Sequence, residues 1–271
     1  MHLQRSRGVG VHNAYPPADD EGRDHEPRAR LRRQRRRHAR PVLRGPVAAL
    51  IEIEGLRLRQ DGRLLFDGAD LSLDGGGRVV IAGPAGSGKG ALARVLIGLV
   101  RPEEGSVRVL GEDLQALDDR GLSALRSRLG VVLADTALIS NLKVIENVAL
   151  PLLHHFPEVP AAEALSRARE LLDVAGYRGG LWDLPGPLST FTRRVVMIAR
   201  AAAARPPVYI FERITYGLFD REAAGVVEVT RRIHGLDPSA LMVFFTGSPA
   251  ELKLIGPTRL IRVSGGRLEE A

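Results

Sequence analysis

The sequence predicts an α/β fold built on a mostly parallel sheet. Two observations support this prediction. Short apolar runs alternate with segments of helical spacing, and a glycine-rich loop joins one apolar run to the helix that follows it. A parallel sheet is buried on both faces, so its strands read as continuous apolar runs bounded by turn residues.

The strands and helices are expected in order from residue 50. The stretches at 50–59 and 68–74 alternate apolar and polar residues, as half-buried strands do. "RVVIAG" at 78–83 is continuously apolar, and helical spacing follows at 90–100. Further strands are expected at 106–110, 130–134, 207–211, 241–246 and 258–263, and further helices at 162–175 and 221–234.

Charge is distributed unevenly along the 271 residues. Residues 1–46 contain 12 Arg and 5 acidic residues, which accounts for the whole net charge of +7. We expect 1–46 to be a disordered Arg-rich extension and 47–271 to be the folded domain. The extension is either a solvated tail, a misassigned upstream start, or a contact for anionic lipid or RNA. The balanced charge of the remainder makes nucleic acid an unexpected partner for the folded part.

The glycine-rich loop reads "GPAGSGKG" and lies between the strand at 78–83 and the following helix. This spacing in this context predicts a phosphate-binding loop, whose backbone N–H groups and helix N-terminus form an anion site. Lys89 would reach the β- and γ-phosphates, whereas Gly90 lacks the hydroxyl that normally holds Mg²⁺. The predicted nucleotide-binding residues are Gly83, Pro84, Ala85, Gly86, Ser87, Gly88, Lys89 and Gly90.

The stretch at 185–220 contains further matches to a known family, in addition to the phosphate loop. From about residue 50 to 271 the chain resembles the ATP-binding subunit of ABC transporters, which carry a Leu-Ser-Gly-Gly-Gln/Met signature, an Arg-Ala pair, Asp-Glu-Pro-Thr and Gly-Leu-Asp. The resemblance implies a phosphate-loop NTPase (RecA-like) core of parallel strands, an antiparallel edge sheet and an inserted helical subdomain at about 135–190. The residues that match without a gap are Leu188, Ser189, Arg193, Ala199, Arg200, Ala201, Thr215, Gly217 and Leu218.

The family's reactive positions are replaced in this chain. By this resemblance the acidic pair falls on Glu212 and Arg213, so that Glu212 is a weak candidate metal ligand and Arg213 replaces the general base. A guanidinium cannot accept a proton in a protein. The signature becomes Leu188, Ser189, Thr190, Phe191 and Thr192, and Phe191 is expected to block approach to a partner's γ-phosphate. The adenine-stacking aromatic falls on Gln60, the γ-phosphate-sensing glutamine on Ala134, the switch histidine on Gly247 and the dimer-contact Asp on Phe219.

Two alternatives stay open for the acidic pair. A one-residue shift would make Glu212 the general base and would put Phe211 at the metal-binding position. In the unshifted alignment, Arg213 either replaces part of the charge of the metal ion, allowing metal-independent ATP binding without turnover, or is a surface or interface residue on a site that binds nothing.

The resemblance implies an ATP-binding subunit of an ABC transporter. The stretch at 145–155 resembles the lipid-transport (Mla/Mce) branch. We expect ATP to be the ligand and its hydrolysis to be absent or very weak. The glycine at position 90 puts the binding of Mg²⁺ in doubt. The implied partners are permease subunits and a second ATP-binding subunit, in a homodimer or heterodimer, on the cytoplasmic face of the cell membrane. The alternatives are a non-catalytic scaffold for an active ATPase and a phosphate-loop protein recruited to nucleic acid by the Arg-rich segment.

Overall fold

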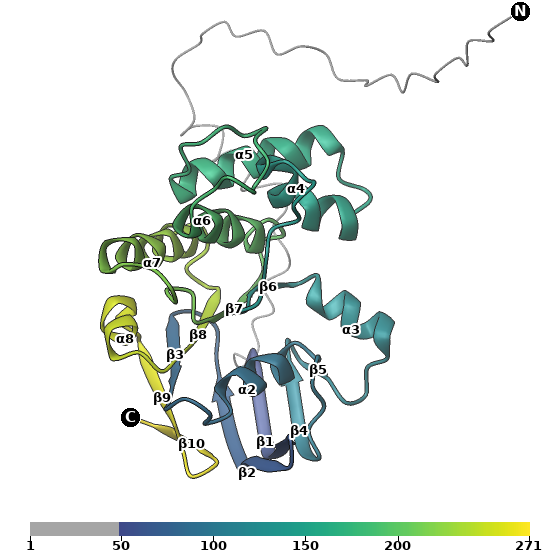
Figure 1. Ribbon diagram of the computed structural model, residues 1–271. Coiled ribbons are helices and arrows are strands. Elements are labelled where there is room, and N and C mark those ends of the chain that lie inside the picture. The colour runs from purple at the N-terminus through teal and green to yellow at the C-terminus, as the bar shows by residue number, and fades with distance from the viewer. Residues whose placement is uncertain (1–48) are drawn as a thin grey trace, which may run out of the picture. The chain divides into compact units, whose positions relative to one another are not determined.

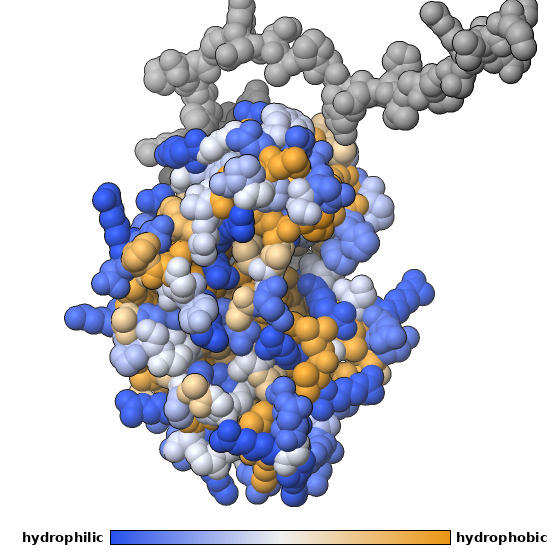
Figure 2. Space-filling view, viewed as in Figure 1, coloured by the Kyte–Doolittle hydropathy of each residue, from blue (hydrophilic) through white to orange (hydrophobic). Residues whose placement is uncertain are grey.

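The computed structural model describes residues 49–271, which form two β-sheets and the helices around them (Figure 1). The Arg-rich extension expected at 1–46, and the lipid or RNA contacts considered for it, lie outside the described residues. On the face shown in Figure 2, hydrophilic and hydrophobic residues are interspersed. Within residues 49–271, no helix combines the length and the apolar character needed to cross a membrane.

The larger sheet contains six strands: β3 (Arg78–Ala82), β6 (Leu129–Val132), β7 (Val208–Glu212), β8 (Leu241–Thr246), β9 (Arg259–Ser264) and β10 (Arg267–Glu270). Their order across the sheet is β10-β9-β3-β8-β7-β6. All neighbouring pairs are parallel except β10 with β9, which is antiparallel. The α/β class predicted from the sequence is therefore confirmed.

The smaller sheet contains four antiparallel strands: β1 (Ile51–Gln60), β2 (Arg63–Leu73), β4 (Glu104–Val109) and β5 (Glu112–Asp113). It corresponds to the expected edge sheet. The strand predicted at 68–74 is only the second half of β2, because a two-residue turn returns the chain immediately after β1. Asp61 and Gly62 make this turn with φ values of 50° and 76°, the backbone of a type I′ hairpin.

The helices are α2 (Lys89–Leu96), α3 (Asp119–Arg126), α4 (Val144–His155), α5 (Ala161–Ala175), α6 (Thr190–Ala201), α7 (Asp220–His234) and α8 (Pro249–Ile255). Helices α5 and α7 begin one residue before the predicted starts and end where predicted. α5 ends at Gly176, whose φ is 77°. Helix α2 stops at Leu96 rather than continuing to residue 100, and Gly98 follows with φ 68°.

The two faces of the six-stranded sheet are buried in different cores. Successive side chains of a strand point to opposite faces. Val80 belongs to the core shared with α4, α5, α6 and α7, whereas Val79 and Ile81 belong to the core shared with α2 and the smaller sheet. Helices α4, α5 and α6 contact one another (teal to green in Figure 1). The boundary of a helical subdomain at about 135–190 stays a prediction.

Candidate functional site

The segment from Gly83 to Gly90 leaves β3 and enters α2, so its backbone lies at the carboxyl end of a central parallel strand. Gly86 and Gly88 have φ values of 73° and 92°, a region that other residues rarely adopt. A Cβ atom on Gly88 would also lie 2.8 Å from the ring of Phe66. These two glycines are required by the loop's conformation, which agrees with a phosphate-binding loop.

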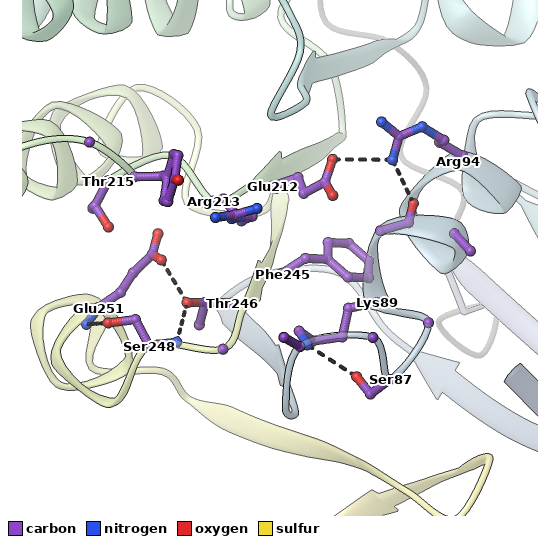
Figure 3. A pocket seen from close by; sticks show the side chains of 18 of the residues that line it. Ser87, Lys89, Arg94, Glu212, Arg213, Thr215, Phe245, Thr246, Ser248 and Glu251 are labelled. Atoms are coloured by element: carbon purple, nitrogen blue, oxygen red, sulfur yellow. Dashed lines mark hydrogen bonds and ion pairs between the residues drawn. The ribbon is translucent and has the colours of Figure 1, made fainter.

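The ammonium of Lys89 folds back over the loop. Its Nζ donates hydrogen bonds to the carbonyl oxygens of Gly83 at 2.6 Å and Pro84 at 2.7 Å. It also donates to the Oγ of Ser87 at 3.1 Å (Figure 3). All three acceptors are uncharged, so the positive charge stays available to an anion. Burial lowers the pKa of Lys89 below 10.5, and the positive charge of Arg213 lowers it further.

A pocket of about 970 Å³ opens over this loop. That volume is at the upper end of the range for small-molecule sites. Its walls come from the hairpin between β1 and β2, the start of α2, the segment after β7 and the segment after β8. The structure therefore brings together the expected nucleotide-site residues Gln60, Ala85, Gly86, Ser87, Gly88, Lys89, Gly90, Glu212, Arg213 and Gly247.

Gly90 and Glu212 meet directly. A Cβ atom on Gly90 would lie 2.5 Å from Oε1 of Glu212, which no side chain tolerates without a shift. The carboxylate of Glu212 is almost fully buried. It accepts a hydrogen bond from the Ala134 N–H at 3.3 Å. It also accepts one from Nη1 of Arg94 at 3.5 Å (Figure 3). Arg94 also donates to the carbonyl oxygen of Gly90 at 3.1 Å.

These contacts do not fit the magnesium site of the family pattern. Gly90 has no hydroxyl, and the carboxylate of Glu212 is already paired with Arg94. Among residues 49–271 no group of three His, Cys, Asp or Glu side chains is arranged to hold a metal ion. The loop fits a nucleotide's phosphates, whereas the expected metal position is filled by protein groups.

Arg213 follows β7 and lines the pocket. Its φ is 50°, an uncommon value for a residue with a side chain, and its N–H donates to the carbonyl oxygen of Phe245 at 3.0 Å. The guanidinium carbon lies 3.9 Å from the centre of the Tyr216 ring, a cation–π contact. The side chain is thus held near the loop, and it offers a cation where the family resemblance implies a base.

The shifted alignment, with Phe211 at the metal position, is not compatible with the structure. The Phe211 ring is buried, with its centroid 5.8 Å from that of Tyr209 and 5.1 Å from that of Phe244. These rings belong to the core shared with the helices and are absent from the pocket wall. Glu212, the next residue, points to the loop because strand side chains alternate.

Position 247 adjoins the phosphate loop, as the switch-histidine expectation requires. A Cβ atom on Gly247 would lie 2.9 Å from the Gly83 carbonyl oxygen and 3.8 Å from Nζ of Lys89. The same wall holds Glu251 on α8, a buried carboxylate that accepts from the Thr246 hydroxyl at 2.6 Å. Burial raises the pKa of Glu251 above 4.5.

The signature residues at the start of α6 lie outside this pocket. Ser189 caps the helix by accepting from the Thr192 N–H at 3.1 Å. The Phe191 ring is turned onto α7, where a Cβ atom on Gly225 would lie 3.0 Å from its Cε2. The expectation that Phe191 blocks the approach of a partner finds no support in this contact, because the ring packs inside its own chain.

The pocket residues that were not anticipated from the sequence include Arg63, Arg94 and Glu251. Arg94 lies four residues after Gly90 on α2, a spacing that puts the two on one helix face and could have drawn attention to it. Arg63 reaches the loop from the hairpin, with Nη1 3.3 Å from the Cβ position of Gly86. No local signal marks Arg63 or Glu251, because each reaches the pocket only through the packing of distant segments.

The fold and the loop together define a phosphate-loop nucleotide-binding domain. Residues 66–213 match the ABC transporter family, and the chain belongs to that family. Within it, the chain corresponds to the ATP-binding subunit.

Relatives and solved structures agree with this assignment. The chain is 34% identical over 209 residues to the lipoprotein-releasing system ATP-binding protein LolD of Pseudomonas syringae pv. tomato, covering 77% of this chain and 90% of LolD. It is 35% identical over 197 residues to the methionine import ATP-binding protein MetN of Mesorhizobium japonicum, covering 73% of this chain and 53% of MetN. The dimeric, post-hydrolysis ATP-binding cassette MJ0796 bound to ADP and Pi superposes with a TM-score of 0.72 at 25% identity, over 82% of this chain and 97% of that one.

Proposed function

We propose that this ATP-binding subunit binds ATP and hydrolyses it very slowly or not at all. The observation that carries the proposal is Arg213, which follows β7, lines the pocket beside Lys89 and stands where the family resemblance implies a general base. Loss of a positioned base typically lowers a rate by about 10²–10⁴.

The rest of the pocket supports binding without turnover. The conformation of the loop and the unneutralised charge of Lys89 favour phosphate binding. Ala134 and Gly247 bring no polar side chain to the positions that would sense the γ-phosphate. Glu212 is held by Arg94, so it is not free to act as a base.

The test compares purified full-length chain with the Lys89→Ala variant. ATP binding is measured by isothermal titration calorimetry and hydrolysis by phosphate release. We expect Lys89→Ala to weaken ATP binding about tenfold or more, because a buried charge-assisted hydrogen bond contributes about 1.5–3 kcal/mol. Lys253→Ala, which removes an exposed lysine from α8, is the matched control and should bind as the parent does.

Hydrolysis separates the proposal from an ordinary ATPase. We expect the parent chain to release phosphate no faster than Lys89→Ala does. Release far above that level, and unchanged in Arg213→Gln, would show that the position after β7 does not limit catalysis and would refute the proposal.

We also propose that the transporter is of the lipid-transport (Mla/Mce) type, with this chain peripheral on the inner face of the membrane beside its permease subunits. The support is the stretch at 145–155, which includes most of α4, and a relative named for a lipoprotein-releasing system. Other relatives are named for methionine import. Mass spectrometry of the affinity-purified permease complex decides between them: bound lipid supports the proposal, and bound methionine contradicts it.

A non-catalytic scaffold for an active ATPase is the second candidate. It is favoured by two exposed aromatic side chains after β7: Tyr216 is 65% exposed and Phe219 is 83% exposed. ATPase activity of a complex copurified with the chain should then persist with Lys89→Ala and fall with Phe219→Ser. Loss of that activity with Lys89→Ala would instead favour the first candidate.

A further inference from the structure

Gly90 and Glu212 are complementary in shape. The ideal Cβ position of Gly90 is 2.5 Å from Glu212 Oε1, so the carboxylate occupies the space that a serine or threonine side chain would need. Glutamate is one methylene longer than the aspartate of the family pattern, and this extra reach brings its carboxylate over the start of α2. The absence of a side chain at Gly90 and the longer side chain of Glu212 are therefore both needed for this contact.

Arg94 completes this contact with a positive charge. Its Nη1 lies 3.5 Å from Oε2 of Glu212 and 3.1 Å from the carbonyl oxygen of Gly90, so one nitrogen touches both partners. Its Nη2 is fixed from the other side by Asp135 at 3.1 Å. The N–H of Ala134 adds a hydrogen bond to the same carboxylate oxygen. The guanidinium is thus held in place by acceptors on three segments.

Positive side chains lie around the phosphate loop without any metal ion. The pocket is lined by four cationic side chains, Arg63, Lys89, Arg94 and Arg213, and by four carboxylates, Asp61, Glu212, Asp220 and Glu251. Because Arg94 pairs with Glu212, the charges of Lys89 and Arg213 remain for the phosphates. Nucleoside triphosphates normally need a divalent cation in such sites to offset their negative charge.

We propose that the Arg94–Glu212 ion pair takes the place of the magnesium ion, so that this pocket binds nucleoside triphosphate without a divalent cation. The proposal rests on the proposed function, namely that the pocket binds ATP. It assigns the substitution for the metal to Arg94, with Arg213 as a second cation, whereas the sequence had suggested Arg213 alone.

The first test measures the dissociation constant of ATP by calorimetry in excess EDTA and in excess Mg²⁺. We expect the two values to agree within about threefold. Binding that is at least tenfold weaker in EDTA would overturn this inference and leave the proposed function standing. No binding in either buffer would overturn both.

The second test removes the arginine. Arg94→Met should weaken binding of ATP in EDTA at least tenfold, since the carboxylate of Glu212 would face the phosphates unpaired. Magnesium should restore part of that loss in the variant. Arg128→Met is the matched control, because Arg128 is about as exposed as Arg94 and its ion pair with Glu112 lies outside the pocket. Equal, small effects of both variants would contradict the proposal.

Two further variants keep the test informative if Arg94→Met folds poorly. Arg94→Lys preserves the charge and should retain ATP binding in EDTA within about fivefold. The double variant Gly90→Ser with Glu212→Asp restores the family's hydroxyl and shorter acid, and it should make ATP binding depend at least tenfold on Mg²⁺. Metal-independent binding by this double variant would show that the Gly90–Glu212 contact does not determine the metal requirement.

Discussion

Replacing Gly90 by alanine sets helix propensity against the tertiary contact with Glu212. Gly90 is the second residue of α2, and alanine is more favourable than glycine inside a helix by about 1 kcal/mol. Propensity alone therefore predicts a more stable protein. The structure predicts the opposite, because the new methyl group would lie 2.5 Å from Oε1 of Glu212.

The magnitude follows from the contacts that must break. The carboxylate would have to leave the Ala134 N–H at 3.3 Å and the Arg94 guanidinium at 3.5 Å. Hydrogen bonds to charged groups contribute about 1.5–3 kcal/mol, and these long distances favour the lower end. Two such contacts amount to about 3 kcal/mol, and subtracting the gain from propensity leaves a net loss of about 2 kcal/mol, or a fall in Tm of about 4–8 °C for a domain of this size.

A double-mutant cycle in urea measures this coupling. In a Glu212→Ala background the obstacle is absent, so Gly90→Ala should stabilise the protein by up to about 1 kcal/mol. The change in the free energy of unfolding caused by Gly90→Ala should therefore have opposite signs in the two backgrounds. The coupling energy should be about 1.5 kcal/mol or more. Equal stabilisation by Gly90→Ala in both backgrounds would refute the contact between these residues.

Three further predictions concern other contacts. Gly225→Val should lower the free energy of unfolding by about 1–3 kcal/mol, because the Phe191 ring lies 3.0 Å from that Cβ position, and a Phe191→Ala background should remove most of the loss in urea titrations. Gly62→Ala should lower the free energy of unfolding by about 1 kcal/mol, as measured by thermal unfolding, because the φ of Gly62 is 76° and no atom lies within 4 Å of its Cβ position. Gly186→Ala is the neutral control, because its Cβ position is equally unobstructed and its φ is not positive. Burial raises the folded-state pKa of Glu251 above 4.5, so this carboxyl contributes stability below about pH 4.5 that is lost as the pH rises through the raised pKa. Glu251→Gln cannot ionise, so its stability relative to the parent should rise between about pH 4 and pH 7, and a pH-independent difference would contradict this assignment.

The parts of the fold with strong local signals could be predicted from sequence. The apolar run of β3 followed by the glycine loop has a length and spacing that few other structures share. Helices α5 and α7 are long and amphipathic, so their period is clear over several turns. Helices α3 and α8, with 8 and 7 residues, are too short to show a period, and β5 and β10 are short edge strands whose pairing depends on neighbours.

The sequence by itself predicted which reactive residues of the family pattern are replaced in this chain. Gly90, Arg213 and Gly247 can be read from the order of motifs, and a guanidinium or a hydrogen atom cannot perform the chemistry of a hydroxyl, a carboxylate or an imidazole. The same reading could place the phosphate loop, because its conformation depends on neighbouring residues along the chain.

Only the tertiary structure decided how those replacements are accommodated. Arg94 and Glu212 are 118 residues apart, and they meet because β7 ends beside the start of α2. The Phe191 ring likewise packs on another helix, α7, because Gly225 has no side chain there. Side-chain contacts of this type depend on the order of strands and the packing of helices, which no local spacing encodes. Because of these contacts, the absence of a hydroxyl at Gly90 is not an isolated change: it makes room for the carboxylate of Glu212.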